Sequence, residues 1–269
     1  MPHINTKKLK TIIVQAAKSE LLPYFANIAH TSKTDNSIVT AADIATQENI
    51  TQQLKQNWPD IPLLGEEMSP AEQEQQLNSD KAVWCLDPLD GTSNFAAGIP
   101  YFAISLALLC NGKAILGVVY DPVRDEYFQA QDLNALLNVT LNDQPLEIKT
   151  THRTLKSAMA IVDLKRLQPS LAARIATEQP FASQRNFGAS ALDWCWLATK
   201  RSHVYLHGNQ NIWDYAAGEL IFRLAGGYSS TLQGEQVFKQ ALEKRSVVAA
   251  IDEKLFNQWF HWIKNSLVK

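Results

Sequence analysis

The fold is decided by the stretch Asp87-Pro88-Leu89-Asp90-Gly91-Thr92-Ser93-Asn94-Phe95, which follows the apolar run 82–86 without a break. A short apolar run closed by Asp-Pro is typical of a buried strand. Pro88 stops the regular strand, so two carboxylates arrive at its carboxyl end, where α/β proteins commonly bind their ligands. This stretch therefore predicts both an α/β core and a ligand site.

The turn after this strand supplies two kinds of group. Asp87, the carbonyl of Leu89 and Asp90 can face one side of the turn, and they are the hard oxygen ligands that Mg²⁺ takes. Gly91 and Thr92 offer backbone N–H groups at a predicted helix start, which suit a phosphate. Turn capping would explain an isolated Asp-Pro or Asp-Gly equally well, but two further acidic motifs accompany this one.

These motifs lie far away in the sequence. Glu66 belongs to Gly65-Glu66-Glu67, which follows the apolar run 61–64. Asp214 belongs to Trp213-Asp214-Tyr215, where we expect it to precede a helix as its N-cap. Two carboxylates 4 Å apart repel by about 4 kcal/mol at an effective dielectric constant near 20. Four of them in one pocket would need cations or bound protons.

The rest of the chain predicts alternating layers of helix and strand. An N-terminal lobe, residues 1–150, would hold two helices, a sheet and the main metal-binding motifs, with a hairpin at Asn111-Gly112. A C-terminal α/β lobe, residues 151–269, would hold the substrate loops and Asp214. The predicted helices are 7–29, 41–57, 170–178, 190–199, 214–225 and 252–266, and the predicted strands are 83–86, 103–109, 114–120, 158–162, 203–206 and 246–250.

Composition narrows the class of ligand. The chain has 269 residues, 46% of them hydrophobic, and a formal charge of −2 with scattered Lys and Arg, which does not favour nucleic acid. No segment has the length or pattern of a membrane span or a signal peptide. The three cysteines lie in apolar runs and are expected to be reduced. A small polar ligand is the best expectation.

The three acidic motifs resemble those of the inositol monophosphatase-like superfamily of magnesium-dependent, lithium-sensitive phosphatases. The likeness continues through segments 39–43, 98–100, 117–122, 188–191 and 225–227. It implies a layered αβαβα sandwich of the sugar-phosphatase type, a cytoplasmic homodimer, and hydrolysis of a small soluble phosphate ester by a metal-activated water. No membrane or nucleic-acid partner is expected.

The resemblance also assigns roles to residues. Magnesium would be bound by Glu66, Asp87, the Leu89 carbonyl, Asp90 and Asp214. Glu66 and Thr92 would position the water, with Asp43 as the partner of Thr92, while the amides of Gly91 and Thr92 would hold the phosphate. The substrate would contact Gly188, Ala189, Ser190, His207 and Asp214.

Two departures from the family pattern leave the leaving group open. His207 stands seven residues before Asp214, where inositol-phosphate enzymes of the family usually have a glutamate, although the polar segment 208–211, expected to be a loop, could shift this alignment. Met68 replaces a common Ser or Thr, which would affect only the segment 69–80, expected to be mobile. Inositol, a sugar, an amino alcohol or an adenosine phosphate could be the leaving group, and fructose 1,6-bisphosphate and 3'-phosphoadenosine 5'-phosphate are alternative substrates.

Two other classes of function compete with this hypothesis. Haloacid dehalogenase-like phosphatases also have an Asp-x-Asp-Gly-Thr turn, but their aspartates are two residues apart, whereas Asp87 and Asp90 are three apart. A regulatory binding protein that retains the fold is the second alternative. A protein with only that role would release no phosphate with Mg²⁺. The complete set of predicted metal-binding residues disfavours this alternative.

Overall fold

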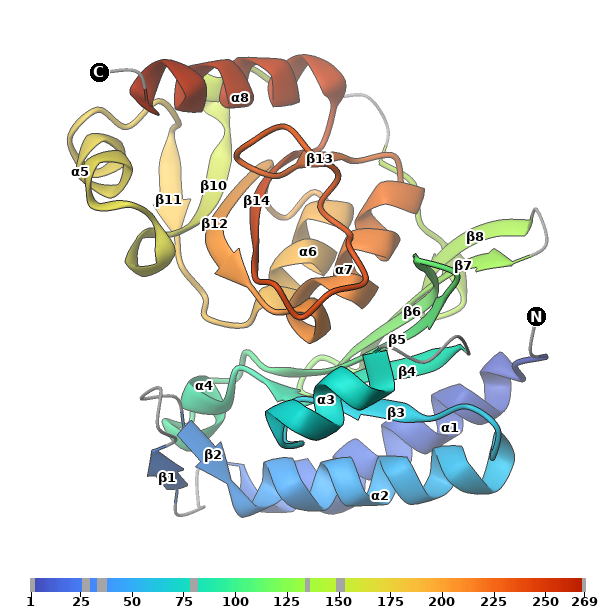
Figure 1. Cartoon of the computed structure of the whole chain (residues 1–269). Helices are drawn as coiled ribbons and strands as arrows, with labels where there is room; N and C mark the ends of the chain where they lie inside the picture. The colour runs from blue at the N-terminus through green and yellow to red at the C-terminus, as the bar shows by residue number, and fades with distance from the viewer. Residues whose placement is uncertain are drawn as a thin grey trace.

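The computed structural model describes residues 3–25, 30–32, 38–77, 82–133, 136–148 and 153–267. Figure 1 shows five layers: helices α1 and α2, a first sheet, helices α6 and α7, a second sheet, and α8 on the outside. This αβαβα order confirms the predicted fold class. Among the described helices, none is long and apolar enough to cross a bilayer.

The first helical layer covers one face of the first sheet. α2 (Ala41–Asn57) begins at Thr40, whose hydroxyl and Asp43 form a capping box. This device fixes the start of the helix. The predicted helix 7–29 is shorter than expected: α1 (Thr6–Ala16) gives way to a π-helical turn (Ala17–Leu21) and a 3-10 turn (Leu22–Tyr24) that contains Pro23. Residues 26–29 lie outside the described residues.

The first sheet has seven strands in the order β3-β4-β5-β6-β7-β8-β9, antiparallel except for the β3–β4 pair. Asn111 and Gly112 have φ angles of 51° and 72°, which confirms the predicted hairpin between β5 and β6. The strands are β3 (Leu63–Gly65), β4 (Val83–Asp90), β5 (Ala103–Cys110), β6 (Lys113–Asp121), β7 (Glu126–Leu133), β8 (Leu136–Leu141) and β9 (Gln144–Pro145).

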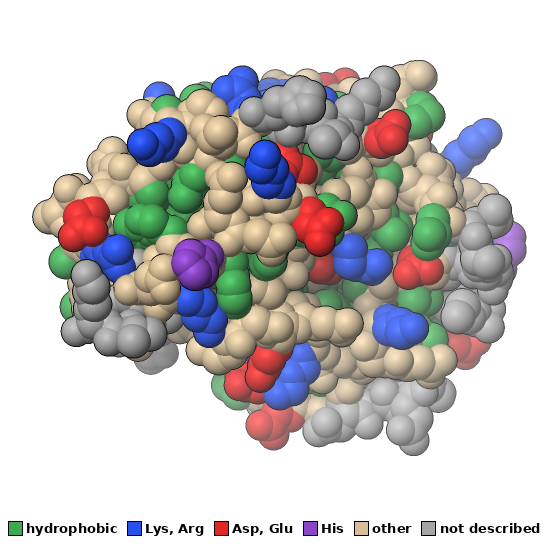
Figure 2. All heavy atoms as spheres, turned by 90° about the horizontal axis from the view of Figure 1, so that it is seen from above, with side chains coloured by type: hydrophobic (Ala, Val, Ile, Leu, Met, Phe, Trp, Pro, Cys, Tyr) green, Lys and Arg blue, Asp and Glu red, His purple; other side chains and the backbone are tan. Residues whose placement is uncertain are grey.

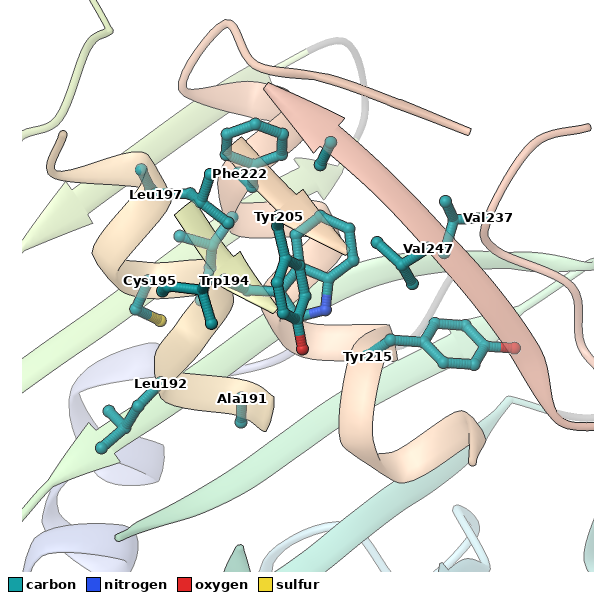
Figure 3. Packing of buried hydrophobic residues seen from close by; sticks show 14 of the residues in the cluster. Ala191, Leu192, Trp194, Cys195, Leu197, Tyr205, Tyr215, Phe222, Val237 and Val247 are labelled. Carbon is teal, nitrogen blue, oxygen red and sulfur yellow. The ribbon is translucent and has the colours of Figure 1, made fainter. Parts of the chain in front are cut away.

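The second sheet is mixed, in the order β11-β10-β12-β14-β13. Figure 3 shows the packing of Trp194, Tyr205 and Phe222, which come from α6, β12 and α7, in the core between the sheets. The strands are β10 (Met159–Asp163), β11 (Ser183–Arg185), β12 (Val204–Gln210), β13 (Tyr228–Ser230) and β14 (Arg245–Ala250). The helices are α5 (Pro169–Thr177), α6 (Ser190–Ala198), α7 (Ile212–Leu224) and α8 (Glu253–Leu267).

Short elements complete the described chain, and two of them correct the sequence expectations. The segment after Glu66 contains a helix that was not predicted, α3 (Pro70–Leu77), capped by Ser69 and Glu72. The expected mobility of segment 69–80 stays a prediction. β12 continues to Gln210 through the expected loop 208–211. The other short elements are β1 (His30–Ser32), β2 (Ile38–Thr40), α4 (Thr92–Ala96) and 3-10 turns at Leu155–Ser157 and Leu164–Arg166.

The distribution of charged side chains on the surface is consistent with the small formal net charge of −2. Figure 2 looks down on the side of α8 and shows basic and acidic side chains interspersed there, without a continuous basic stripe among the described residues. A continuous stripe would be the electrostatic footprint of a nucleic-acid site.

Candidate active site

Strand β4 delivers the first carboxylates from the middle of the first sheet. It is buried along its whole length, and its pairing with β5 shifts register between Asp87 and Asp90. Asp87 Oδ1 accepts a hydrogen bond from the Leu89 amide at 3.0 Å, which closes a tight turn around Pro88. The extra residue in β4 is a bulge, a feature that re-aims side chains at the edge of functional sites.

Four acidic side chains influence one another electrostatically at this turn. Burial raises the pKa of Asp87 well above its usual value, and the negative charges of Glu66, Asp90 and Asp214 raise it further. Burial also raises the pKa of Asp90, with Asp214 as the next cause. Acidic residues from β4, from the turn after β3 and from α7 are therefore near enough to influence one another's charge. That they bind a metal together stays a prediction.

Backbone amides hold two of these carboxylates in place. Asp90 accepts hydrogen bonds from the amides of Ser190 (3.1 Å) and Ala191 (2.6 Å) at the start of α6. Asp214 accepts the amide of Asn211 at 2.8 Å. The expectation that Asp214 is an N-cap is wrong: α7 begins two residues earlier, Asn211 is the cap, and Asp214 completes the capping box at the third helical position.

The donor set fits a hard divalent cation. In the described part of the chain, no three His, Cys, Asp or Glu side chains converge closely enough to enclose a metal ion. Buried carboxylates whose pKa values are raised by one another are, however, stabilised by any cation that neutralises them. Oxygen donors of this kind suit Mg²⁺.

A hydroxyl group lies next to the acidic cluster. Thr92 Oγ1 is 3.0 Å from Asp43 Oδ1 and 3.0 Å from the Leu89 carbonyl oxygen, so its single proton can bond to either acceptor. Asp43 is only 1% exposed, and its other oxygen accepts both the amide and the hydroxyl of Thr40. Burial raises the pKa of Asp43 despite these hydrogen bonds. The predicted partnership of Thr92 and Asp43 is present in the structure.

Two loops meet beside Thr92. Gly91 caps α4 with a φ of 92°, and a methyl group there would lie 3.0 Å from both the Cβ of Ala189 and the carbonyl oxygen of Tyr101. Gly188 also has a positive φ, 80°. Asn94 joins the loops, because its side-chain amide donates to the carbonyls of Tyr101 (2.8 Å) and Phe187 (2.7 Å). Gly188, Ala189 and Ser190 thus border the acidic cluster.

His207 lies on β12 and is only 6% exposed. Its Nδ1 accepts the amide of Asn209 at 3.1 Å, and its Nε2 is 3.3 Å from Asp163 Oδ2. Asp163 has a lowered pKa: burial raises it, but the contacts with His207 outweigh this effect. Both ring nitrogens are therefore already engaged in contacts within the protein.

The sequence did not single out Asp163 or Asp193. Asp193 is buried in α6 behind the amides that hold Asp90, and Tyr101 donates its hydroxyl to it at 3.0 Å. Burial raises the pKa of Asp193 well above its usual value, and the charge of Asp90 adds to this. Asp193 could have been noticed in the sequence, because it is a single carboxylate within the apolar segment 191–198.

The chain is similar to known proteins over most of its length. The model of the inositol monophosphatase family matches residues 5–263. Nus factor SuhB of Pasteurella multocida is 33% identical over 209 residues, 76% of this chain and 75% of its own length. Inositol monophosphatase 1 of Solanum lycopersicum is 33% identical over 208 residues, 75% of this chain and 74% of its own length.

Solved structures share the fold over nearly the whole chain. The extragenic suppressor protein SuhB of Bartonella henselae has a TM-score of 0.81 at 28% identity, covering 96% of this chain and 98% of its own. An IMPase/NADP phosphatase complexed with Mg²⁺ and phosphate has a TM-score of 0.79 at 22% identity, covering 97% and 92%.

The family match and the relatives named inositol monophosphatase show that the chain is a phosphatase of the phosphoric monoester hydrolase class. More specifically, the chain belongs to the inositol monophosphatase family.

Proposed function

We propose that this protein is a Mg²⁺-dependent phosphomonoesterase that hydrolyses a small soluble phosphate ester with a water nucleophile. The observation that carries the proposal is that Asp87 and Asp90 are both buried in one strand, where burial, and then the charges of Glu66 and Asp214, raise the pKa of each. Burying carboxylates that repel one another is costly, and either bound protons or bound cations can offset their charge. Relatives named inositol monophosphatase and a structural neighbour with Mg²⁺ and phosphate support the choice of cation and substrate class.

The residues of this chain would divide the work as follows. Glu66, Asp87, Asp90, Asp214 and the carbonyl of Leu89 would hold the cations. When bound, Mg²⁺ would neutralise these carboxylates, polarise the phosphoryl oxygens and lower the pKa of a water molecule.

The Thr92–Asp43 pair would orient and deprotonate the water. With its proton directed to Asp43 Oδ1, Thr92 Oγ1 has lone pairs free to accept a hydrogen bond from the water, which Glu66 would hold on its other side. The raised pKa of Asp43 favours transfer of the hydroxyl proton to that carboxylate as Thr92 takes one from water. The amides of Gly91 and Thr92 would bind the phosphoryl oxygens.

The leaving group would lie between the 188–190 loop and β12. Gly188, Ala189 and Ser190 would contact it from one side, and His207 and Asp214 from the other. Inositol monophosphate or a related polyol phosphate is the substrate class that the family favours. We further propose a cytoplasmic homodimer, from the family resemblance, which light scattering and cell fractionation would test.

The direct test is phosphate release by the purified protein from a panel of phosphate esters. We expect turnover with Mg²⁺, none with excess chelator, and inhibition by Ca²⁺, whose longer and less regular coordination would misplace the reacting groups. Li⁺ should also inhibit, as the resemblance implies. Full activity in chelator would contradict the metal mechanism, and no activity on any ester would favour a regulatory binding protein.

A further inference from the structure

The two loops that border the acidic cluster are joined by side chains from both sides. Asn94 of α4 donates to the carbonyls of Tyr101 (2.8 Å) and Phe187 (2.7 Å), and so connects the loop after α4 to the loop before α6. The hydroxyl of Tyr101 reaches further, into the first turn of α6, where it donates to Asp193 Oδ1 at 3.0 Å. Tyr101 is therefore held by its carbonyl and by its hydroxyl.

The bond between Tyr101 and Asp193 is enclosed by the protein. Tyr101 is 4% exposed and Asp193 is 3% exposed. The ring of Tyr101 packs against Phe187 and Trp196, with 4.9 Å between the ring centroids in each pair. A hydrogen bond that is shielded from water is electrostatically stronger than an exposed one, and removing one partner leaves the other unsatisfied. The bond therefore restrains both of the segments that it joins.

Asp193 is also connected to the second sheet. Burial, and then the charge of Asp90, raise its pKa, while hydrogen bonds with the hydroxyls of Tyr101 and Tyr205 lower it. The hydroxyl of Tyr205 in turn accepts the side-chain amide of Gln210 at 2.7 Å, and both residues belong to β12. Asp193 thus links the first turn of α6 to the loop after α4 and to β12.

The first turn of α6 is the anchor of Asp90. The amides of Ser190 and Ala191 donate to its two carboxylate oxygens at 3.1 and 2.6 Å. Asp193 lies two residues beyond Ala191, and its own amide closes the same turn by donating to the carbonyl of Ala189 at 3.0 Å. A side chain that restrains a helical turn also restrains the direction of the amides in that turn. Asp193 can therefore act on Asp90 through the backbone, without touching it.

We propose that Asp193 is a positioning residue: through its bond to Tyr101 it holds the first turn of α6 in place, and this turn keeps Asp90 in the orientation that the reaction needs. The inference rests on the proposed function and adds a residue that touches neither the phosphate nor its cations. The competing interpretation is that the bond between Tyr101 and Asp193 only stabilises the fold.

The chain offers a matched control for that interpretation. Tyr120 is 1% exposed and donates its hydroxyl to Asp125 Oδ1 at 2.8 Å, within the hairpin of β6 and β7. This bond also joins a buried tyrosine to an aspartate, but it lies in an element that does not hold Asp90. Loss of either hydroxyl should lower stability, whereas only loss of the Tyr101 hydroxyl should disturb the anchor of Asp90.

The first experiment needs no turnover, because it measures hydrogen exchange at the amides of Ser190 and Ala191 by NMR in metal-free protein. Exchange at the amides of β5 serves as the reference for global stability. Tyr101→Phe removes the hydroxyl and keeps the ring, and it should speed exchange at the two anchoring amides at least about tenfold relative to this reference. Tyr120→Phe should leave the ratio within about twofold of the wild-type ratio.

The second experiment measures kcat, KM and the Mg²⁺ concentration that gives half-maximal activity. In Tyr101→Phe this concentration should rise, and kcat should fall, by about fivefold or more, because Asp90 would meet the cation in the wrong orientation. Asp193→Leu should have the same effect. Asp193→Asn keeps an oxygen that can accept the hydroxyl of Tyr101, so it should stay within about threefold of the wild type, as should Tyr120→Phe.

The outcomes separate the positioning role from the phosphatase. An unchanged exchange ratio in Tyr101→Phe would overturn the positioning role, as would an unchanged Mg²⁺ requirement or an equal response in Tyr120→Phe, and the phosphatase would stand. If the wild type hydrolyses no ester, the proposed function fails, and the exchange ratio alone decides whether Asp193 anchors the turn. Tyr101→Phe carries the test if Asp193→Leu does not fold.

Discussion

The two sides of the candidate active site are built differently. On the phosphoryl side, Asp43, Asp87 and Asp90 are buried, and each accepts at least one backbone amide. On the leaving-group side, His207 accepts the amide of Asn209 but also contacts the side chain of Asp163, and the neighbouring Arg166 is exposed. Backbone anchoring fixes the geometry of a reaction shared by a family, whereas side-chain pairs and exposed cations can change without disturbing the fold.

The largest effect should come from removing a carboxylate on the phosphoryl side. Asp90→Asn and Asp214→Asn should each lower kcat/KM by about three orders of magnitude or more, because a cation would lose a charged ligand while the amide side chain keeps the shape. Phosphate release and circular dichroism measure activity and folding, with the exposed Asp60→Asn as control. More than about a tenth of wild-type activity in a folded variant would contradict the proposed site.

A smaller loss is expected when only the proton path is changed. Thr92→Val should lower kcat by about a hundredfold, since it removes the hydroxyl that would contact both the water and Asp43. Thr92→Ser keeps the hydroxyl and should remain within about tenfold of the wild type. Equal activities of the Val and Ser variants in steady-state assays would show that the hydroxyl has no part in proton transfer.

The metal-free protein should lose stability as pH rises from 5 to 8. Burial and repulsion raise the folded-state pKa values of Asp87 and Asp90, so the folded state binds more protons than the unfolded state once pH exceeds the unfolded value of about 3.9. The free energy of unfolding then falls as pH rises. The total fall is about 1.4 kcal/mol for each unit by which the folded-state pKa exceeds the unfolded-state pKa.

Urea unfolding in chelator measures this slope. Asp87→Asn should flatten it, and Mg²⁺ should restore stability at pH 8. Stability that rises with pH in the metal-free wild type, and an unchanged slope in the variant, would refute the electrostatic account of the phosphoryl side.

The smallest effect is expected on the leaving-group side. His207→Glu, combined with Asp163→Asn to avoid two facing carboxylates, should change the preference among phosphate esters while the inhibition constant of free phosphate stays within about threefold. The measurement is kcat/KM for inositol monophosphate, fructose 1,6-bisphosphate and adenosine 3',5'-bisphosphate. An unchanged ranking would mean that His207 only supports β12.

The same contrast explains what the sequence could predict. α2 matched its expected range, and β4 began at Val83 as expected, because local apolar spacing determines both. The expectation that Pro88 stops the strand is wrong, because β4 continues through a bulge to Asp90 while it stays paired with β5. The contact between Thr92 and Asp43 was predicted only through the family resemblance, since the two residues are far apart in sequence. The interpretation of Asp214 as N-cap failed because Asn211, an equally good cap, stands three residues earlier.

The leaving-group side was harder to predict because tertiary pairing overrides local preference there. Gly208 and Asn209 disfavour a strand, yet β12 extends to Gln210, where it pairs with Arg245 of β14. The contact between His207 and Asp163 joins two strands that are far apart in sequence, and no local pattern signals it. Helix α3 was missed because its polar sequence has only a weak apolar face.

The central claim is that Glu66, Asp87, Asp90 and Asp214 form a metal site that binds phosphate. The most direct test is a crystal structure of the protein with phosphate and Mn²⁺, a stand-in for Mg²⁺ that is located by its anomalous scattering. The account predicts anomalous peaks in contact with the carboxylates of Asp87, Asp90 and Asp214, and a phosphate bridging from these peaks to the amides of Gly91 and Thr92. Carboxylates free of metal at saturating Mn²⁺, or peaks confined to other acidic residues, would contradict it.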